Sequence, residues 1–585
     1  EIKDMDEGEY AVAVRREEGQ PAAAVLPDLM TDLIGSLHFR QSMRWNQTGV
    51  TFSRPIRWLV GLLGDTLVPF EYAGVASGRR SHGPRSTGSP AFKIPSTADY
   101  LALLHQHGIV ADPDERRTFI AARARTLADS VGGRIPEDPE LLSEVTHLVE
   151  QPNPFVGEFE EQYLSLPTEV LVAVMKKHQR TFPVLSEEGE MLPYFVAVRN
   201  GGDEHLDIVR HGNEEVIRAR FADAEYFYEE DTSQPLEDFL PRLDTLTFQE
   251  ELGSVLDKTH RLETLVPELA PLVDLTSEET ELAVRAAHLC KADLAAQMVV
   301  EHTSLQGVMG REYALKSGER PEVARAIYEH YLPRSAGDEL PESKIGLTVG
   351  LADRLDSLAG LFAIGLIPTG SADPYGLRRD ALGLVQSLLA HQLSFSIERG
   401  LREAGKLLPV EARDEALAEA LEFVVERLRG TLRDAGYRYD VVDGVLAERG
   451  DDPHRARQGV EELSRWVERH DWDTILDNYS RCVRITRSYD EHFEFDPALF
   501  QEPAEEELYE AYRDARLEVT PESSVDELLT AFLPLVELID RYFARESGVL
   551  VMTQDEAVRR NRLAQLQRIA ALAHGIVDLS PLEGF

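Results

Sequence analysis

The hydrophobic pattern of the chain changes near Phe239, and this change limits the fold to at least two kinds of domain. Before this point, short apolar runs such as residues 57–63, 66–72 and 194–198 are separated by turn residues, which is typical of strands mixed with helices. After it, apolar residues recur every three or four positions, as in residues 323–331 and 347–362. We therefore expect an α+β N-terminal region followed by all-α domains.

Within the N-terminal region, the clearest local signal is a β-hairpin. Two extended segments, Phe182–Leu185 and residues 191–198, are joined by a short loop that contains Gly189. The apolar run 170–174 predicts a further strand. Residues 99–108 and 114–131 have the spacing of helices, so this region should contain both kinds of element.

The length of the chain predicts several domains. A chain of 585 residues is longer than one hydrophobic core supports, so we expect three to five domains. In the helical part, residues 365–374 contain two prolines and a Gly-Ser pair, which cannot continue a helix. This loop should separate two helices, the second of which begins near Tyr375.

Charge and cysteine content exclude several classes of protein. The formal net charge of −43 repels a polyanion over most of the surface, so a nucleic-acid site must be a local basic patch. Two cysteines, Cys290 and Cys482, allow neither a disulfide framework nor a cysteine-rich zinc site, which favours a reducing cytoplasm. No apolar run approaches the ~18–20 residues of a transmembrane helix, and no signal peptide is visible, so we expect a cytoplasmic protein without membrane contact.

Short motifs spread over most of the chain, in a fixed order, resemble one known family. They are Ser-Met-Arg-Trp at 42–45, Phe-Ser-Arg-Pro at 52–55, Leu-Pro-Thr-Glu-Val at 166–170, the segments 212–220, 248–253, 290–293, 305–310, 327–334 and 351–356, Gly-Leu-Ile-Pro-Thr-Gly-Ser at 365–371, and the segments 555–559 and 561–563. With these motifs the chain resembles the beta subunit of bacterial heterotetrameric glycyl-tRNA synthetase.

The resemblance implies a domain order. It implies an editing-domain-like α+β region at 1–235, a helical domain related to HD-type phosphohydrolases at 236–395, and a helical linker at 396–470. It further implies an all-α anticodon-binding domain of the arginyl-tRNA synthetase type at 471–585. Two departures from the family are visible: its first N-terminal segment is expected to be missing, and its Gly-His-Arg motif is replaced by Gly83-Pro84-Arg85, where we expect a local turn.

The resemblance also implies a division of labour. A partner alpha subunit would use ATP and Mg²⁺ to make glycyl-tRNA, and this chain would bind and position the glycine tRNA within an assembly of two alpha and two beta subunits. We expect no cofactor on this chain and no DNA partner. The sequence agrees, because it contains neither a class II ATP-binding motif nor a Gly-x-x-x-x-Gly-Lys-Ser/Thr phosphate loop.

The metal scheme of HD-type hydrolases fails here. These enzymes hold a divalent ion through a His, an adjacent His-Asp pair and a distant Asp. His260 and Asp353 could fill the outer positions, but the region of the pair, residues 288–293, contains Lys291 where a cation should lie. We therefore expect no metal, and structural roles for Asp293 and Asp353. A metal-dependent HD-type phosphohydrolase and a non-enzymatic RNA-binding scaffold remain as alternatives.

Two groups of basic residues in the C-terminal region are candidates for tRNA binding. Arginines recur at three-residue spacing on one helix, preceded by an asparagine one turn earlier, and a second group follows near the C-terminus. The residues are Asn478, Arg481, Arg484 and Arg487, and then Arg559, Arg560, Arg562 and Arg568. In such an acidic chain, these stripes are either solvated helix faces or phosphate contacts.

Two acidic residues before the second group allow two interpretations. Asp555 and Glu556 lie four residues before Arg559 and Arg560, which fits helical ion pairs. Alternatively, their carboxylates could accept hydrogen bonds from cytosine N4 in the glycine anticodon. We retain both residues as candidate tRNA contacts.

A third candidate contact follows the loop at 365–373. Arg378 and Arg379 stand at the start of a predicted helix, where backbone N–H groups could receive a phosphate. Arginines at this end oppose the helix dipole, which points to an anionic neighbour. Asp373 and Asp380 could supply that anion internally, so RNA contact and internal pairing both remain open.

Overall fold

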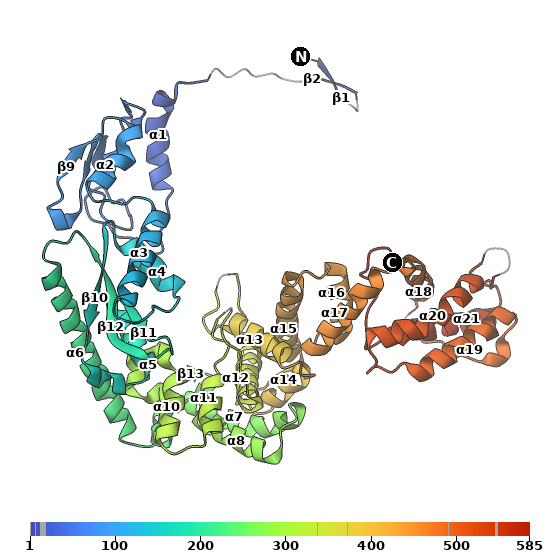
Figure 1. The fold of residues 1–585 in the computed structure, drawn as a ribbon. Helices are drawn as coiled ribbons and strands as arrows, with labels where there is room; N and C mark the ends of the chain where they lie inside the picture. Colours follow the sequence, from blue (N-terminus) through green and yellow to red (C-terminus); the bar gives the residue numbers. More distant parts are fainter. Residues whose placement is uncertain are drawn as a thin grey trace. The chain divides into compact units, whose positions relative to one another are not determined.

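The chain forms two compact units in the computed structural model, Glu1–Tyr226 and Phe227–Phe585 (Figure 1). The structure describes the backbone of residues 2–5, 8–11, 19–335, 337–370, 372–489, 491–544 and 548–585, with side chains from residue 19 onward. The boundary between the units falls within the long helix α6 (Leu206–Thr232). None of the helices in these described ranges has the length and hydropathy that a bilayer-spanning segment requires.

The first part of the N-terminal unit contains small sheets. Its elements are β1 (Ile2–Met5) paired with β2 (Gly8–Ala11), α1 (Ala22–Gly35), the sheet β3-β7-β6 (Leu59–Val60, Val75–Gly78, Glu71–Tyr72), β4 (Leu62–Leu63) with β5 (Thr66–Leu67), β8 (Arg80–His82) with β9 (Ala91–Lys93), and α2 (Tyr100–Gln106). Phe92, Ile94 and Leu104 form a small core. The strands expected at 57–63 and 66–72 are therefore present, but each run is divided into two short pieces.

The second part of the N-terminal unit is a three-stranded antiparallel sheet covered by two helices. The strand order is β10 (Pro152–Glu158), β12 (Met191–Asn200), β11 (Phe182–Leu185). Helices α3 (Pro113–Asp129) and α4 (Pro139–Leu148) bury apolar side chains such as Ile120 and Val145 against it. The predicted hairpin is confirmed, since Phe182 pairs with Val196 and Leu185 with Met191.

The strand predicted at 170–174 is wrong. These residues belong to α5 (Thr168–Val174), which buries Val170, Leu171 and Val174. An unbroken apolar run of five residues does not distinguish a buried strand from a buried helix by its period. Val170 and Val174 are four residues apart, so a helix places both on the same side, where both are buried.

Helix α12 (Lys344–Ala363) is the centre of the helical unit and is buried along almost its whole length. The neighbours that contact it are α7 (Val255–Leu269), α8 (Ser277–Leu289), α11 (Pro321–Glu329), α13 (Leu377–Ala390), α14 (Ile397–Gly405) and α15 (Asp414–Asp434) (Figure 1). A helix that is buried on every side requires such a shell of neighbours. Two shorter helices, α9 (Gln297–Glu301) and α10 (Val308–Lys316), belong to the same unit.

Two details of the helical unit differ from the sequence prediction. A short antiparallel pair, β13 (Thr247–Gln249) with β14 (Gly253–Ser254), lies beyond Phe239, where no strand was expected. Strands of two and three residues are too short to show alternation, and Gly253 with φ 88° provides the turn. The helical pattern at 282–298 is also broken, because α8 ends at Leu289 before Lys291 turns into the protein interior.

The last part of the chain continues the helical pattern. Helices α16 (Tyr439–Arg449) and α17 (Pro453–Val467) lead to four helices that we call the C-terminal bundle: α18 (Trp472–Thr486), α19 (Pro503–Glu518), α20 (Val525–Tyr542) and α21 (Glu556–Ala570) (Figure 1). Leu476, Leu535 and Ile569 are buried in it. The α+β then mostly helical order is thus confirmed, whereas the domain families assigned to these regions stay predictions.

Candidate nucleic-acid interface and central charge network

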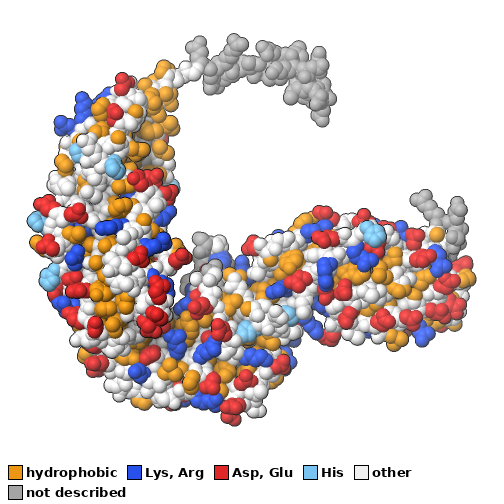
Figure 2. Space-filling model, in the orientation of Figure 1, with side chains coloured by type: hydrophobic (Ala, Val, Ile, Leu, Met, Phe, Trp, Pro, Cys, Tyr) orange, Lys and Arg blue, Asp and Glu red, His pale blue; other side chains and the backbone are white. Residues whose placement is uncertain are grey.

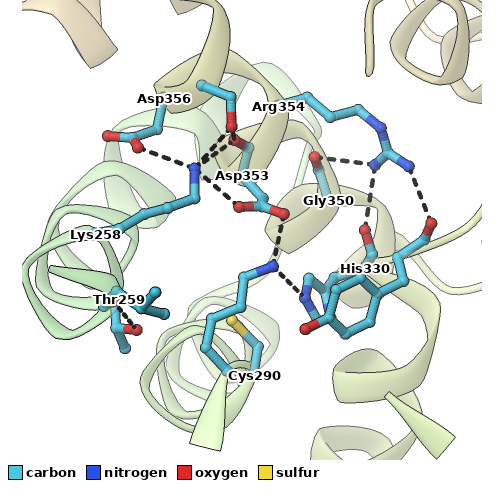
Figure 3. A network of polar contacts seen from close by, with 12 residues as sticks. Lys258, Thr259, Cys290, His330, Gly350, Asp353, Arg354 and Asp356 are labelled. Atoms are coloured by element: carbon cyan, nitrogen blue, oxygen red, sulfur yellow. Dashed lines mark hydrogen bonds and ion pairs between the residues drawn. The ribbon is translucent and has the colours of Figure 1, made fainter. Parts of the chain in front are cut away.

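Charged side chains meet beside α12, where the HD-type scheme would place a metal ion. Lys258 Nζ of α7 lies 3.0 Å from Asp353 Oδ1, and Lys291 Nζ lies 2.8 Å from Asp353 Oδ2. Lys291 Nζ also lies 2.9 Å from His330 Nε2, while His330 Nδ1 lies 2.6 Å from the Ile327 carbonyl oxygen. Figure 3 shows Lys258 pointing at Asp353, with His330 approaching from another helix. Both oxygens of Asp353 therefore face ammonium groups.

A second carboxylate completes this arrangement. Asp356 accepts hydrogen bonds from Lys258 Nζ at 3.0 Å and from Arg261 Nε and Nη2 at 2.6 and 3.0 Å. The side chain of Asp356 is only 1% exposed. We call Lys258, Arg261, Lys291, Asp353 and Asp356 the central charge network. Its cations outnumber its carboxylates.

The surroundings fix the protonation states of the network. Burial alone would raise the pKa of Asp353, but Lys258 and Lys291 hold it well below its usual range. Burial would likewise lower the pKa of Lys258, yet Asp353 and Asp356 raise it. Burial lowers the pKa of His330 well below its ordinary value, so this ring is neutral and accepts from Lys291 at Nε2.

The residues present do not suit a divalent metal ion. Metal ligands must have free lone pairs, and those of Asp353 face ammonium groups. His260, the other outer candidate, lies at the exposed surface of α7. Across the described ranges, no group of three or more His, Cys, Asp or Glu side chains is placed to hold a metal.

Asp293 has a structural role, as does Asp353. Its Oδ2 accepts from the backbone N–H groups of Gly307 at 2.6 Å and Gly310 at 3.0 Å, and its side chain is fully buried. Burial raises the pKa of Asp293 to about 6, although the two N–H donors oppose this shift. This carboxylate therefore fastens the loop before α10 to the helical core.

The first group of candidate tRNA contacts is divided by burial. Asn478 is 1% exposed and donates to the Thr474 carbonyl of its own helix, so its prediction as a surface contact is corrected. Arg481 reaches the surface, where it pairs with Asp477 at 2.5 Å and Asp540 at 3.0 Å. Arg484 and Arg487 are exposed at the end of α18, with the Arg484 guanidinium 5.7 Å from the centre of the Phe585 ring.

The second group is divided in the same way. Arg562 is 4% exposed and makes two 3.0 Å contacts with the buried Glu505, so it joins α21 to α19 and offers no surface to RNA. Arg560 pairs with Glu491 and lies over the Phe493 ring. The other two members are Arg559, which donates to the Thr553 carbonyl, and Arg568, which is exposed over the Phe495 ring.

The two acidic residues at the start of α21, Asp555 and Glu556, have different roles. Asp555 is the N-cap residue of α21, and its Oδ1 accepts from the N–H groups of Ala557 and Val558 at 3.0 and 3.2 Å. Glu556 lies 3.8 Å from Arg560 as the i,i+4 partner, with 71% of its side chain exposed. Capping and ion pairing therefore account for both residues, and base recognition stays a prediction.

The loop before α13 closes on itself. Asp373 accepts from the N–H groups of Leu377 and Arg378, both at 2.9 Å, and thus takes the place that a phosphate would need. Arg378 donates to the Gly370 carbonyl at 2.8 Å. Ser371 lies outside the described residues. Arg379, in contrast, makes no side-chain hydrogen bond to the described part of the chain.

Sequence reasoning missed three members of the central charge network: Lys258, Arg261 and Asp356. A signal for them was present, because Lys258 and Arg261 are three residues apart on one helix, as are Asp353 and Asp356 on another. Residues at this spacing share a helix face. Two such pairs of opposite sign on apolar helices indicate a buried contact between those helices.

The surface of the C-terminal bundle is mixed in charge. On the face drawn in Figure 2, acidic and basic side chains are interspersed over these helices. The described residues of this face of the bundle therefore show no broad area of basic side chains alone. A polyanion would have to replace the carboxylates that contact Arg481 and Arg560.

Comparison with known proteins places the chain among tRNA ligase subunits. A family described as "Glycyl-tRNA synthetase beta subunit" matches residues 1–447. The chain is 40% identical over 589 residues to the glycine–tRNA ligase beta subunit of Moorella thermoacetica, which covers 99% of this chain and 84% of that protein. The corresponding protein of Desulforudis audaxviator is 42% identical over 579 residues, covering 98% and 83%. A plant relative, glycine–tRNA ligase, chloroplastic/mitochondrial 2 of Arabidopsis thaliana, is 38% identical over 99% of this chain and 54% of its own length.

Proposed function

The chain belongs to the glycyl-tRNA synthetase beta subunit family and acts in glycine–tRNA ligation, and we propose that its exposed C-terminal arginines bind glycine tRNA for a partner alpha subunit. The alpha subunit would activate glycine with ATP and Mg²⁺, and the assembly would contain two subunits of each kind. This chain then needs no cofactor of its own. Its place of action would be the cytoplasm.

The observation that supports this proposal is the exposure of arginines on α18 and α21. Arg481, Arg484, Arg487, Arg560 and Arg568 keep their guanidinium groups at or near the surface. Two of them, Arg481 and Arg560, contact carboxylates in exposed pairs, each worth under about 1 kcal/mol. Phosphate oxygens can therefore replace those carboxylates at little cost in stability, with bidentate geometry as an added gain.

The domain families follow from the same proposal. Residues 471–585 would be the anticodon-binding domain, and residues 396–470 the helical linker. Residues 236–395 would be an HD-like domain without a metal site, and residues 1–235 an editing-domain-like region. The ammonium groups that surround Asp353 argue against the alternative of an HD-type phosphohydrolase.

An exchange assay separates ligation from a purely RNA-binding scaffold. The purified chain alone should form no glycyl-adenylate, so glycine-dependent ATP–pyrophosphate exchange should be absent. Addition of the purified alpha subunit with Mg²⁺, glycine and glycine tRNA should give charged tRNA. Exchange activity by the chain alone, or charging that does not depend on the chain, would refute the proposed division of labour.

A further inference from the structure

A hollow of about 270 Å³ opens beside the central charge network, within the helical unit. Its basic lining residues are Lys258, Lys291, Arg334, Arg354 and Arg379. Its acidic lining residues are Asp353 and Asp380. In a chain with a formal charge of −43, a hollow whose charged lining residues are mostly basic favours an anion.

The positive charge of the hollow is only partly neutralised by the protein. Asp353 serves both lysines, and Arg334 has its own partner in Asp338 at 2.8 Å. Arg354 is 6% exposed, and its hydrogen bonds go to the carbonyl oxygens of His330, Gly350 and Leu332. Carbonyl groups satisfy its N–H donors but carry no net charge, so the charge of Arg354 is offset only in part, by the nearby carboxylates of Asp380 and Asp353.

Of the two carboxylates in the lining, Asp353 already contacts Lys258 and Lys291, so Asp380 is the one that would mainly oppose an anion. Burial raises the pKa of Asp380, although Arg354 counteracts the shift. Asp380 therefore takes up a proton more readily than a surface carboxylate. Arg379, beside it in sequence, also lines the hollow.

Three lining groups have hydrogen-bond donors to spare. The Tyr331 hydroxyl is buried and has no hydrogen-bond partner among the described residues. The Lys291 ammonium lies over the Tyr331 ring, 4.3 Å from its centre, and directs two contacts at Asp353 and His330, which leaves one of its three N–H groups without a hydrogen-bond acceptor among the described residues. Arg379 donates no side-chain hydrogen bond within the described ranges. A buried donor without an acceptor costs free energy, and a bound anion would recover it.

We propose that this hollow binds a phosphate group, with Lys291, Tyr331 and Arg379 as donors to its oxygens. A phosphate accepts hydrogen bonds at several oxygens and donates few, which matches three donors that line one hollow, two of them cations. The hollow is larger than one phosphate, so the attached group also finds space. That phosphate would belong to a free nucleotide or to an RNA backbone. This site is separate from the arginines of α18 and α21 and does not depend on their role.

The first test measures binding of inorganic phosphate and of AMP to the full chain by calorimetry. Tyr331→Phe and Arg379→Gln should each weaken binding about tenfold, since each removes a donor to a charged group. Both should leave the melting temperature unchanged, because Tyr331 loses an unpaired hydroxyl and Arg379 is exposed. Arg378→Gln is the matched control: it removes the same charge one residue away, outside the lining of the hollow.

The second test identifies the source of the phosphate. If Tyr331→Phe and Arg379→Gln weaken binding of the glycine tRNA, the phosphate belongs to the RNA backbone. If they weaken binding of phosphate or AMP only, the ligand is a free nucleotide. Equal affinities of the wild type and both variants for every probe would overturn the proposal. An equal loss of affinity in Arg378→Gln would also overturn it, because that result would show a general electrostatic attraction rather than a binding site.

Discussion

The centre of the helical unit and the C-terminal bundle use the same charged residues in opposite ways. Around α12, the side chains of Lys258 and Asp356 are 5% and 1% exposed and lie 3.0 Å apart. On α18 and α21, Arg481 and Arg560 are 35% and 43% exposed and pair with carboxylates that are more exposed still. Burial, not residue type, therefore decides whether an ion pair holds the fold or can be exchanged for a ligand.

This difference has a thermodynamic reason. A buried charge that loses its partner keeps its full desolvation cost, which is commonly about 3–5 kcal/mol. An exposed charge that loses its partner is solvated by water, and the loss is under about 1 kcal/mol. Single substitutions can therefore sort the charged residues of this chain into structural and exchangeable groups.

The largest effect is expected at Asp356. Asp356→Ala leaves Lys258 and Arg261 buried without this carboxylate and should destabilise the helical unit by about 3–5 kcal/mol. Asp540→Ala, which removes an exposed partner of Arg481, should cost under about 0.5 kcal/mol. Urea unfolding followed by circular dichroism measures the unfolding free energy of both variants. Similar losses in the two would contradict the distinction between buried and exposed ion pairs.

A second test stays within one helix of the C-terminal bundle. Arg562→Ala leaves Glu505 buried, but Gln501 and Glu502 still donate backbone N–H groups to it, so the loss should be about 3 kcal/mol. Arg560→Ala, two residues earlier, should cost under about 0.5 kcal/mol. Thermal unfolding of the two variants provides the comparison, and an Arg562→Ala variant as stable as the wild type would contradict the assigned role of this pair.

A third test uses pH. Burial raises the folded pKa of Asp293 to about 6, above the ordinary value of an aspartate, so the folded state binds the proton more tightly than the unfolded state. Its stabilising contribution is full below about pH 4 and is lost as the pH rises to about 6. Asp293→Asn cannot lose a proton, and its amide oxygen can still accept from Gly307 and Gly310. Its stability relative to the wild type should therefore increase by about 2 kcal/mol across this window.

The control for this test is internal. All other carboxylates titrate in both proteins, so only the difference between the two unfolding free energies is interpreted. A difference that stays constant from pH 4 to pH 7, or that decreases as the pH rises, would show that Asp293 is not held as a buried carboxylate of raised pKa.

Much of the local fold followed from the sequence, but the partners of the charges did not. The hairpin at Phe182–Leu185 and the apolar helix α12 had clear periodic patterns. Spacing also placed Arg562 and Asn478 on helices, yet it could not show which helix covers them. That information belongs to long-range packing, since Glu505 lies 57 residues before Arg562. The strand predicted at 170–174 was wrong for a related reason. An unbroken apolar run indicates that a segment is buried, but it does not show whether the segment is a strand or a helix.

Binding of the glycine tRNA to a variant that carries Arg481→Gln, Arg484→Gln and Arg487→Gln is the most direct measurement of the proposed surface. If the wild type makes about four phosphate contacts, the logarithm of its affinity should fall with the logarithm of salt concentration with a slope near −3. The variant should bind more weakly, with a slope closer to zero by about 2, and with an unchanged melting temperature. Equal affinity and equal slope in the two proteins would contradict the proposal and leave these arginines as a solvated helix face.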